Sequence, residues 1–223
     1  MNDEKAVSPK EGRVARRQRR NRAALIRAAS DVMSLKGIDA ATMLEIAERA
    51  DMGAGTVYNY FRSKEDLAVA VLEEIMQDLA LRVETAARSF RDPAHIYALT
   101  LLTVLDTAAT DPRWKQLLGR SGIVADAMYR RIGPLAKDLL ANGASAGRFA
   151  KGDPSLCWTL TTHAIVGICL AVYRGETSAE SLPEAAIRLL CLAGLTPEEA
   201  RDLVTRPRPD LPPMRVLSEA HPG

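Results

Sequence analysis

The sequence is poor in cysteine and in aromatic residues, and it carries almost no net charge. Its three cysteines, Cys157, Cys169 and Cys191, show no C-x-x-C spacing. Three cysteines without that spacing exclude a disulfide framework and favour a reducing compartment. Residues 1–10 are polar and contain no apolar run of signal-peptide length. We therefore expect a cytoplasmic protein without a secretory leader.

Long apolar runs are also nearly absent. Only residues 156–173 stay uncharged over a length that approaches a membrane span, and three threonines and His163 lie near the middle of this segment. A bilayer would penalise these polar side chains. We expect a buried helix here and no membrane partner.

Signatures of enzymes and of metal sites are missing too. His95, His163 and His221 have no metal-ligand spacing, and the chain has no Gly-rich phosphate loop and no G-x-S-x-G elbow. Cys157 and His163 are six residues apart, which is about 240° around a helix axis, so they form no catalytic dyad. We expect no enzymatic activity, no cofactor and no metal.

What the sequence does contain is helical periodicity along nearly its whole length. No segment alternates with period two, which predicts an all-α fold. Seven helix starts are marked, four by a hydroxyl three residues before a carboxylate and three by Asp-Pro pairs. These starts are at Thr42, Ser63, Ser181, Thr196, Asp92, Asp111 and Asp153. With helices over about 16–36 and 123–146, the latter broken near Gly133-Pro134, we predict nine or ten helices.

Two short helices joined by a three-residue turn are predicted over residues 42–61. The first carries apolar residues at i, i+3, i+4 and i+7, which is one buried stripe. The turn is Asp51-Met52-Gly53, and the second helix, Ala54 to Phe61, directs Val57 and Phe61 toward the core. This arrangement is a helix-turn-helix.

The outward side chains of the second helix suit DNA. Thr, Tyr and Asn side chains bind phosphates and base edges, and Gly55 leaves room for a duplex backbone. Lys64 begins the next helix, where its ammonium and free N–H groups can hold a phosphate. Through Lys64 the chain has 13 Lys and Arg against 8 Asp and Glu, about +5, whereas the remainder has 17 against 20, about −3. The N-terminal part therefore suits a polyanion.

The stretch from Thr42 to Leu67 resembles the N-terminal domain of the tetracycline-repressor (TetR) family. The resemblance covers about residues 19–79, and its most specific part is Gly55-Thr-Val-Tyr-Asn-Tyr-Phe61 followed by Ser63-Lys64. It implies phosphate contacts by Thr42, Thr56, Tyr60 and Lys64, and an approach to base edges by Leu44, Ala54, Gly55 and Tyr58. With the arginine-rich entry to the first helix, the full DNA-binding candidates are Arg17, Arg20, Thr42, Leu44, Ala54, Gly55, Thr56, Tyr58, Asn59, Tyr60 and Lys64.

Three positions depart from the family pattern. Asp51 replaces the usual turn glycine, and Gly53 replaces a Ser or another strong N-cap. Asp tolerates the left-handed conformation and Gly is a fair cap, so the motif survives. Ala54 replaces a long polar side chain, which leaves more of the base readout to Tyr58 and the arginine arm.

The family resemblance also implies the organisation of the rest of the chain. We expect the helix-turn-helix domain over 13–65 and a helical effector-binding and dimerisation domain over 66–205. From composition we further expect a disordered tail over 1–12 and a Pro-rich tail over 206–223, of which the last dozen or so residues are loose. In such proteins the last two long helices pack against their dimer mates.

Two sets of candidates follow for the second domain. Small residues at three- and four-residue spacing and a second apolar stripe predict a dimer interface formed by Ala164, Gly167, Ala171, Ile187, Leu190 and Cys191, with a monomer core as the alternative. Bulky side chains in the helices expected around a cavity predict an effector pocket formed by Trp114, Met128, Tyr129, Trp158, His163 and Tyr173, with plain core packing as the alternative. Because aromatics are only 4% of the chain, a pocket would be lined mainly by aliphatic side chains.

These features predict a sequence-specific DNA-binding transcription regulator. We expect a homodimeric repressor that a small, largely apolar effector releases from a palindromic operator in double-stranded DNA. The alternative is an architectural or adaptor DNA-binding protein with no effector. A ligand-dependent change in operator affinity separates the two.

Overall fold

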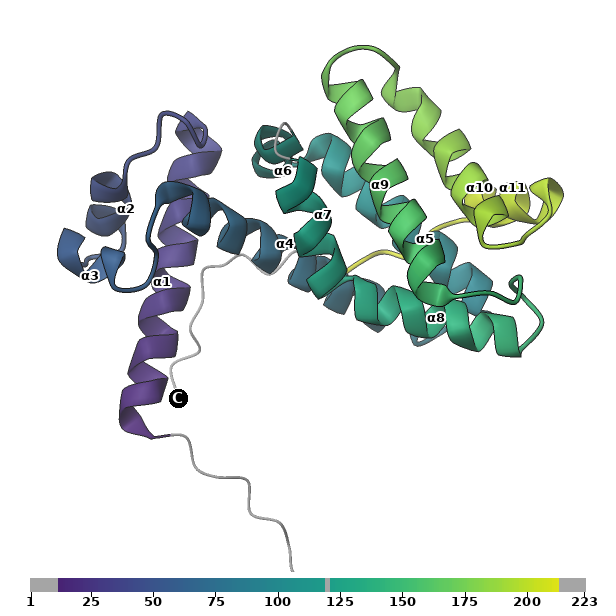
Figure 1. The fold of residues 1–223 in the computed structure, drawn as a ribbon, viewed down its shortest axis with the longest axis horizontal. Helices are drawn as coiled ribbons and strands as arrows, with labels where there is room; N and C mark the ends of the chain where they lie inside the picture. Colours follow the sequence, from purple (N-terminus) through teal and green to yellow (C-terminus); the bar gives the residue numbers. More distant parts are fainter. Residues whose placement is uncertain (1–11, 119–120, 213–223) are drawn as a thin grey trace, which may run out of the picture. The chain divides into compact units, whose positions relative to one another are not determined.

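A computed structural model describes residues 12–118 and 121–212 (Figure 1). This part of the chain consists of α-helices and one 3-10 helix and contains no strand, so the all-α prediction is confirmed. Eleven α-helices are present within it, slightly more than predicted. The chain divides into two compact units, and the boundary between them follows Leu67.

The first unit consists of three helices, α1 (Arg13–Lys36), α2 (Met43–Arg49) and α3 (Ala54–Tyr58). Its core is aliphatic, with Leu25 and Ile46 fully buried. Thr42 and Glu45 form the predicted capping box at the start of α2. Helix α1 ends where Gly37 adopts φ 87°, a conformation that a β-carbon disfavours.

The turn between α2 and α3 forms despite its unusual residues. Asp51 has φ 54° and is the only described non-glycine residue with a positive φ, which the short polar side chain of Asp tolerates. Gly53 is the N-cap of α3 and contributes no side-chain hydrogen bond. Helix α3 ends at Tyr58, earlier than the predicted Phe61, because the N–H of Tyr60 already bonds three residues back to Val57.

The second unit is a bundle of longer helices, joined to the first by α4, which begins before the boundary. Its elements are α4 (Lys64–Ala87), α5 (Pro93–Thr110), α6 (Pro112–Leu117), α7 (Ser121–Arg131), α8 (Gly133–Ser145), α9 (Pro154–Tyr173), the 3-10 helix η2 (Ala179–Ser181), α10 (Leu182–Leu192) and α11 (Pro197–Thr205).

Most of the predicted helix starts in this unit are confirmed. The carboxylates of Asp92, Asp111 and Asp153 each accept a backbone N–H at the start of the following helix. Ser181 is the N-cap of α10 as predicted, but its side chain makes no capping hydrogen bond, whereas Ser178 caps the preceding 3-10 turn.

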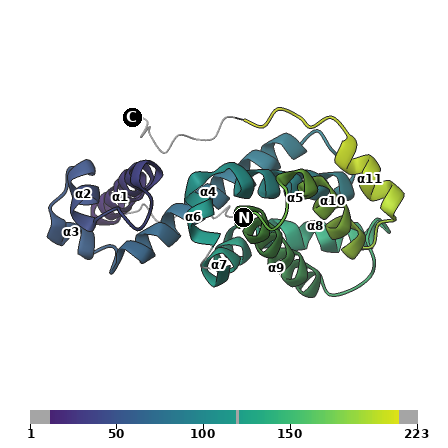
Figure 2. The same cartoon turned by 90° about the horizontal axis from the view of Figure 1, so that it is seen from above.

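Helix α5 lies at the centre of the second unit. It packs against α8, α9, α10 and α11 (Figure 2). Tyr97 of α5 is fully buried, and its hydroxyl lies 3.2 Å from the Thr161 hydroxyl of α9. Burial raises the pKa of Tyr97, so the phenol remains neutral and can serve only as a hydrogen-bonding group.

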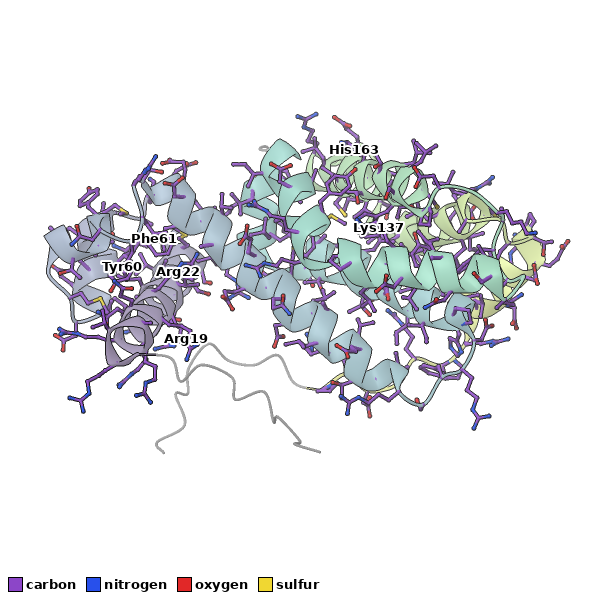
Figure 3. All side chains as sticks on the ribbon, turned by 60° about the horizontal axis from the view of Figure 1, so that its bottom comes forward. Arg19, Arg22, Tyr60, Phe61, Lys137 and His163 are labelled. Atoms are coloured by element: carbon purple, nitrogen blue, oxygen red, sulfur yellow. The ribbon has the colours of Figure 1, made fainter. Side chains whose placement is uncertain are left out.

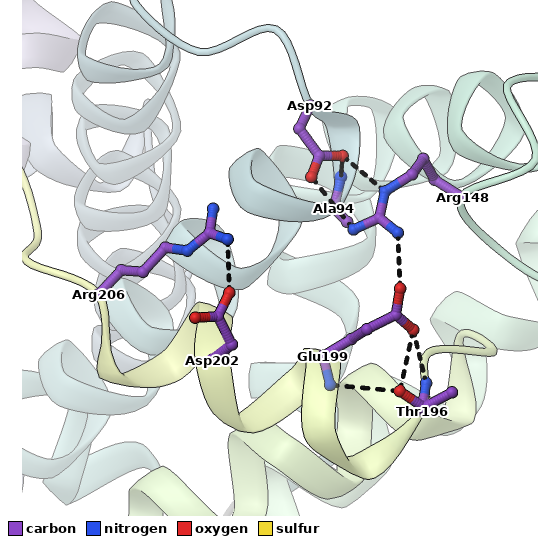
Figure 4. Close-up of polar contacts among 7 residues, drawn as sticks. All are labelled: Asp92, Ala94, Arg148, Thr196, Glu199, Asp202 and Arg206. Carbon is purple, nitrogen blue, oxygen red and sulfur yellow. Dashed lines mark hydrogen bonds and ion pairs between the residues drawn. The ribbon is translucent and has the colours of Figure 1, made fainter.

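An ion-pair network ties together three parts of this bundle (Figure 4). Arg148, between α8 and α9, donates to Asp92 at the start of α5 and to Glu199 of α11. Burial by itself would raise the pKa of Asp92, but the Arg148 guanidinium and the Ala94 N–H outweigh it and lower the pKa.

The described part of the Pro-rich tail, residues 206–212, makes polar contacts with the second unit. Arg208 pairs with Asp106 of α5, and the Pro212 carbonyl accepts a hydrogen bond of 2.6 Å from Arg82 Nε. Prolines cannot continue a helix, but their carbonyls still accept hydrogen bonds. The rest of that predicted tail and residues 1–11 of the N-terminal tail lie outside the described residues.

Candidate DNA-binding interface and effector region

Helix α3 and its C-cap Asn59 present four of the predicted DNA-contacting residues to solvent. Val57 is fully buried and fixes the orientation of the helix, whereas Tyr58 is 56% exposed. Ala54, Gly55 and Asn59 are exposed. A large aromatic side chain this exposed on a short helix is suited to contact with a partner.

The start of α2 adds a second set of exposed groups. The Thr42 hydroxyl accepts the Glu45 N–H at 3.2 Å, and the Thr42 side chain also hydrogen-bonds the Glu45 carboxylate. Leu44, the second residue of α2, is 58% exposed. Hydrogen bonds from Lys36 and Thr42 lower the pKa of Glu45, so the capping carboxylate stays ionised.

Two polar contacts fix the frame that carries these helices. The Arg49 guanidinium donates twice to Asp31, at 3.2 and 2.9 Å, and so ties α2 to α1. Lys64 Nζ donates to the Asp39 carbonyl at 2.7 Å, which directs the ammonium toward the loop between α1 and α2. Two N–H donors of that ammonium remain for a phosphate.

The first half of α1 is a cationic surface. Arg17 and Arg20 are exposed, and the first turn contains no acidic residue. Arg22 stacks over the Phe61 ring, 5.2 Å from its centroid, close to the half-buried Tyr60 (Figure 3). The sequence pattern did not reveal this cation–π contact, because it joins residues 39 positions apart.

The predicted pocket residues divide into two groups. Trp114, Met128 and Trp158 are buried in the second unit, and Tyr129 is half-buried. His163 (Figure 3) and Tyr173 are exposed on α9 in the single chain, apart from the buried members of the predicted set. The inward face of α9 carries residues such as Trp158, Thr162 and Ile165, and positions 163 and 173 lie off that face.

The buried part of this region holds polar groups that have no partner among the described residues. They are Trp114 Nε1, Trp158 Nε1 and Thr162 Oγ1. Trp158 and Thr162 are one turn apart on α9, and the Trp158 indole lies against Gly133, where a β-carbon would come within 3.0 Å of Nε1. Thr162 escaped the sequence-based prediction, although a threonine four residues after a tryptophan in an apolar helix was the available signal.

Each unsatisfied buried donor or acceptor costs roughly 1–3 kcal/mol relative to a solvated one. Native interiors therefore contain few of them, and each one calls for an explanation such as a water or a ligand. Two such groups, Trp158 Nε1 and Thr162 Oγ1, lie on consecutive turns of α9.

The outer face of α9 is apolar and uncovered in the single chain. Ala164 and Gly167 are exposed and Ala171 is half-buried, as an interface requires. The same stripe extends back to Leu160 and Leu156, which are 48% and 58% exposed and which the prediction did not include. Pro154–Tyr173 is the one described helix long and apolar enough to cross a membrane, yet its other face packs into the unit.

Helix α10 corrects the other half of the predicted interface. Ile187 and Leu190 are 8% and 0% exposed, so they belong to the core of their own chain. Their stripe covers α5 and α9 rather than a second molecule. Cys191 is half-buried, and Leu192, 44% exposed, is the large apolar side chain that α10 leaves in solvent.

The described residues contain no group of three or more His, Cys, Asp or Glu side chains that could hold a metal ion. Burial raises the pKa of Cys157, and it raises that of Cys169 to about 12, so both thiols are poor nucleophiles.

A three-helix unit whose third helix is exposed, followed by a larger helical unit, is the arrangement of a helix-turn-helix transcription regulator. Residues 25–71 match the profile of bacterial regulatory proteins of the tetR family, and residues 92–206 match that of the tetracyclin repressor-like C-terminal domain. The chain belongs to the TetR family.

Curated relatives of this chain are transcription regulators. The repressor KstR of Mycolicibacterium smegmatis is 28% identical over 61% of this chain and 68% of its own length. The regulator BetI of Burkholderia ambifaria is 29% identical over 60% of this chain and 70% of its own length. The activator FasR of Mycolicibacterium smegmatis is 39% identical, but only over 36% of each chain.

Solved structures show the same fold. RolR in complex with resorcinol has a TM-score of 0.80 and 28% identity, with 89% of this chain and 100% of that chain covered. FadR of Bacillus subtilis in complex with stearoyl-CoA has a TM-score of 0.59, with 78% of this chain and 98% of that chain covered. At 19% identity, the likeness to FadR concerns the fold alone.

Proposed function

We propose that this chain is a sequence-specific repressor that binds a palindromic operator as a homodimer, acts in the cytoplasm and leaves DNA when a small molecule binds its second unit. The observation that carries the proposal is the exposed set on α3 and the start of α2, held in place by buried Val57 and by the capping box. Thr42, Thr56, Tyr60 and Lys64 would contact phosphates, and Leu44, Ala54, Gly55 and Tyr58 would approach base edges.

Homodimerisation is supported by the stripe on α9. Leu160 and Leu156 are 48% and 58% exposed and share one face of α9 with Ala164 and Gly167. Exposing this apolar surface to water is unfavourable, and burying it against a partner would be favourable. An apolar groove of about 210 Å³, lined in part by Leu156, Leu160 and Leu192, continues this face. The small residues would allow a second α9 to approach closely, and a two-fold dimer would read an inverted repeat.

The effector class is supported by the unsatisfied polar groups in the second unit. Trp158 Nε1 requires an acceptor, and Thr162 Oγ1 can accept or donate. A phenol offers a flat apolar ring and one oxygen that can accept and donate, which fits a mostly apolar interior with two polar groups on one helix face. RolR, whose structure contains resorcinol, is 28% identical to this chain.

The first experiment selects duplexes from a random pool with the purified protein and measures its mass by sedimentation. We expect an inverted repeat bound by a dimer. Failure to enrich any sequence, or a monomer that binds its duplex at full strength, would contradict the proposed DNA recognition.

The second experiment screens resorcinol, phenol and benzene for thermal stabilisation and for release of the selected duplex. We expect the two hydroxylated compounds to act and benzene to have little effect, because benzene cannot satisfy the buried donors. Compounds that stabilise the fold yet leave duplex affinity unchanged would favour the alternative, a DNA-binding protein without effector control.

A further inference from the structure

The Pro-rich segment after α11 runs back across α5 to α4 (Figure 2). On the way, Arg208 forms its ion pair with Asp106 of α5, and at the far end Arg82 of α4 donates to the Pro212 carbonyl. Three of the six residues 207–212 are half-buried, so this segment lies against the helices. We call residues 207–212 the C-terminal strap.

A hollow of about 470 Å³ remains between the strap and these two helices. Its size is within the range of small-molecule sites, about 300–1,000 Å³. Five residues of α5, from Leu99 to Thr110, form its floor, and all of its lining belongs to the second unit. Tyr97, which contacts α9, lies on the opposite face of α5. The hollow is therefore separate from the polar groups of Trp158 and Thr162.

The floor of the hollow offers hydrogen-bond acceptors. Thr103, Thr107 and Thr110 share one face of α5, with neighbours about 5–6 Å apart. Each hydroxyl donates its single hydrogen to the carbonyl four residues earlier, at 2.7 Å. The three oxygens can therefore only accept a further hydrogen bond. A ligand on this floor must supply the donors.

The charges around the hollow favour a cation. Asp106 borders it from α5 and Asp210 from the strap. Arg82 is paired with Asp78, one turn earlier on α4, and both side chains are mostly buried. Among the lining residues, Arg208 is then the guanidinium that balances two carboxylates. The last turn of α5 has no basic residue of its own, although a helix C-terminus favours positive charge.

The strap itself shows that a cation fits at this place, because the Arg208 guanidinium is seated on Asp106. Both side chains of this pair are 49% exposed. Exposed ion pairs contribute little to stability, since water replaces either partner. A soluble cation that makes additional contacts in the hollow can therefore displace Arg208.

We propose that the hollow under the C-terminal strap binds a linear aliphatic diamine, with one ammonium on Asp106 in place of Arg208 and the other near Asp210. The two ammonium groups supply the donors that the carboxylates and threonine oxygens accept. Three or four methylenes separate two amines by about one helical turn, and Leu99 and Leu211 offer apolar cover for that chain. This site is independent of the proposed DNA and effector sites.

Equilibrium dialysis of the full chain against radiolabelled 1,4-diaminobutane, without DNA and at fixed ionic strength, tests the site. Unlabelled butylamine, which has one ammonium, and 1,4-butanediol, which has none, are the control competitors. We expect the diamine to bind, butylamine to compete at least about 10-fold less effectively, and butanediol not to compete, because each loses charge-assisted contacts. Equal competition by butylamine and unlabelled diamine would overturn a site with two ammonium positions.

Four variants locate the bound diamine. Asp106→Asn should weaken binding about 10-fold or more, because one charge-assisted contact is lost. Its matched control, Asp202→Asn, removes the carboxylate from the exposed pair with Arg206 and should leave the affinity unchanged. Arg208→Ala removes the competing guanidinium and should tighten binding about 2-fold or more. Arg206→Ala makes the same change in net charge and should not tighten it.

Two results would overturn the proposal. One is equal weakening by Asp106→Asn and Asp202→Asn, which indicates diffuse attraction to surface charge. The other is no retention of the diamine by either the wild-type chain or Arg208→Ala, which keeps Asp106 without its competitor. If Asp106→Asn does not fold, Thr107→Val replaces it and should weaken binding about 2-fold or more by removing one acceptor. Because the assay contains neither DNA nor a phenol, its failure leaves the proposed function standing.

Discussion

The two units of this chain differ in where their candidate binding groups lie. In the first unit the side chains suited to a partner are on the outside, with Tyr58 and Leu44 more than half exposed on two very short helices. In the second unit the informative groups are inside, where the Trp158 and Thr162 polar atoms have no partner among the described residues.

This difference follows from the size of what each unit would bind. A DNA duplex is larger than the unit and can only be met by a surface, so the contacting residues lie within a short stretch of helix-turn-helix. A small molecule is enclosed, so its contacts must come from several helices. The residues of a DNA-binding surface can therefore lie close together in the sequence, whereas the residues of an enclosed small-molecule site come together only when distant helices pack.

The largest expected effect concerns the outer face of α9. Gly167→Glu should yield monomers and weaken operator binding by at least about 100-fold, because two half-sites joined in one dimer gain 10²- to 10⁴-fold in avidity. Sedimentation and duplex titration measure the two effects. Asn142→Glu, at an exposed position of α8, is the control and should leave both unchanged. A dimeric Gly167→Glu variant would exclude this face as the interface.

The next prediction tests whether the first unit separates affinity from sequence preference. Lys64→Ala should weaken binding to all duplexes similarly and reduce the salt slope by about one unit, because one phosphate contact is lost. Tyr58→Ala should instead reduce the difference in affinity between the selected duplex and variants of it. Titrations at several salt concentrations distinguish the two, and an unchanged salt slope for Lys64→Ala would exclude Lys64 as a phosphate contact.

A matched pair of substitutions on α9 tests whether the interior of the second unit is prepared for a ligand. Thr162→Val removes a buried hydroxyl that has no partner and should stabilise the unliganded protein by about 1 kcal/mol. Thr161→Val should destabilise it by about 1–2 kcal/mol, because it leaves the buried Tyr97 hydroxyl unpaired. Denaturant unfolding measures the change in the free energy of unfolding for both variants. If both changes have the same sign, the Thr162 hydroxyl has a hydrogen-bond partner as the Thr161 hydroxyl does.

The smallest expected effect is a pH dependence in the network at the start of α5. The folded state lowers the pKa of Asp92 below its ordinary value of 3.8, so Asp92 stabilises the fold above that pH and the contribution disappears as pH falls through the folded pKa. Asp92→Asn should therefore make the free energy of unfolding less dependent on pH below about 4. Asp126→Asn, an exposed carboxyl on α7, should retain the wild-type slope.

Much of the fold could be predicted because its signals are local. The capping boxes at Thr42 and Thr196 and the Asp-Pro starts at Asp92, Asp111 and Asp153 each depend on residues within one helical turn. Ser181 had the same local signal and is the N-cap of α10, but its side chain makes no capping hydrogen bond, and Ser178 caps the 3-10 turn before it.

The candidate sites were only partly predictable for the same reason. Exposure of Ala54, Gly55 and Tyr58 follows from the burial of Val57 on a five-residue helix. The burial of Ile187 and Leu190 does not follow from their periodicity, because an apolar stripe is equally suited to its own core and to a partner.

The sequence by itself determined the all-helical class, the position of the helix-turn-helix and the TetR family, because periodicity, caps and a contiguous motif are short-range properties. Only the tertiary structure decided which α9 side chains are outside, that Trp158 Nε1 and Thr162 Oγ1 have no partner among the described residues, and that Glu73 of α4 pairs with Arg130 and Arg131 of α7. Those facts depend on how helices far apart in the chain pack, and helical periodicity says which residues share a face but not what that face will touch.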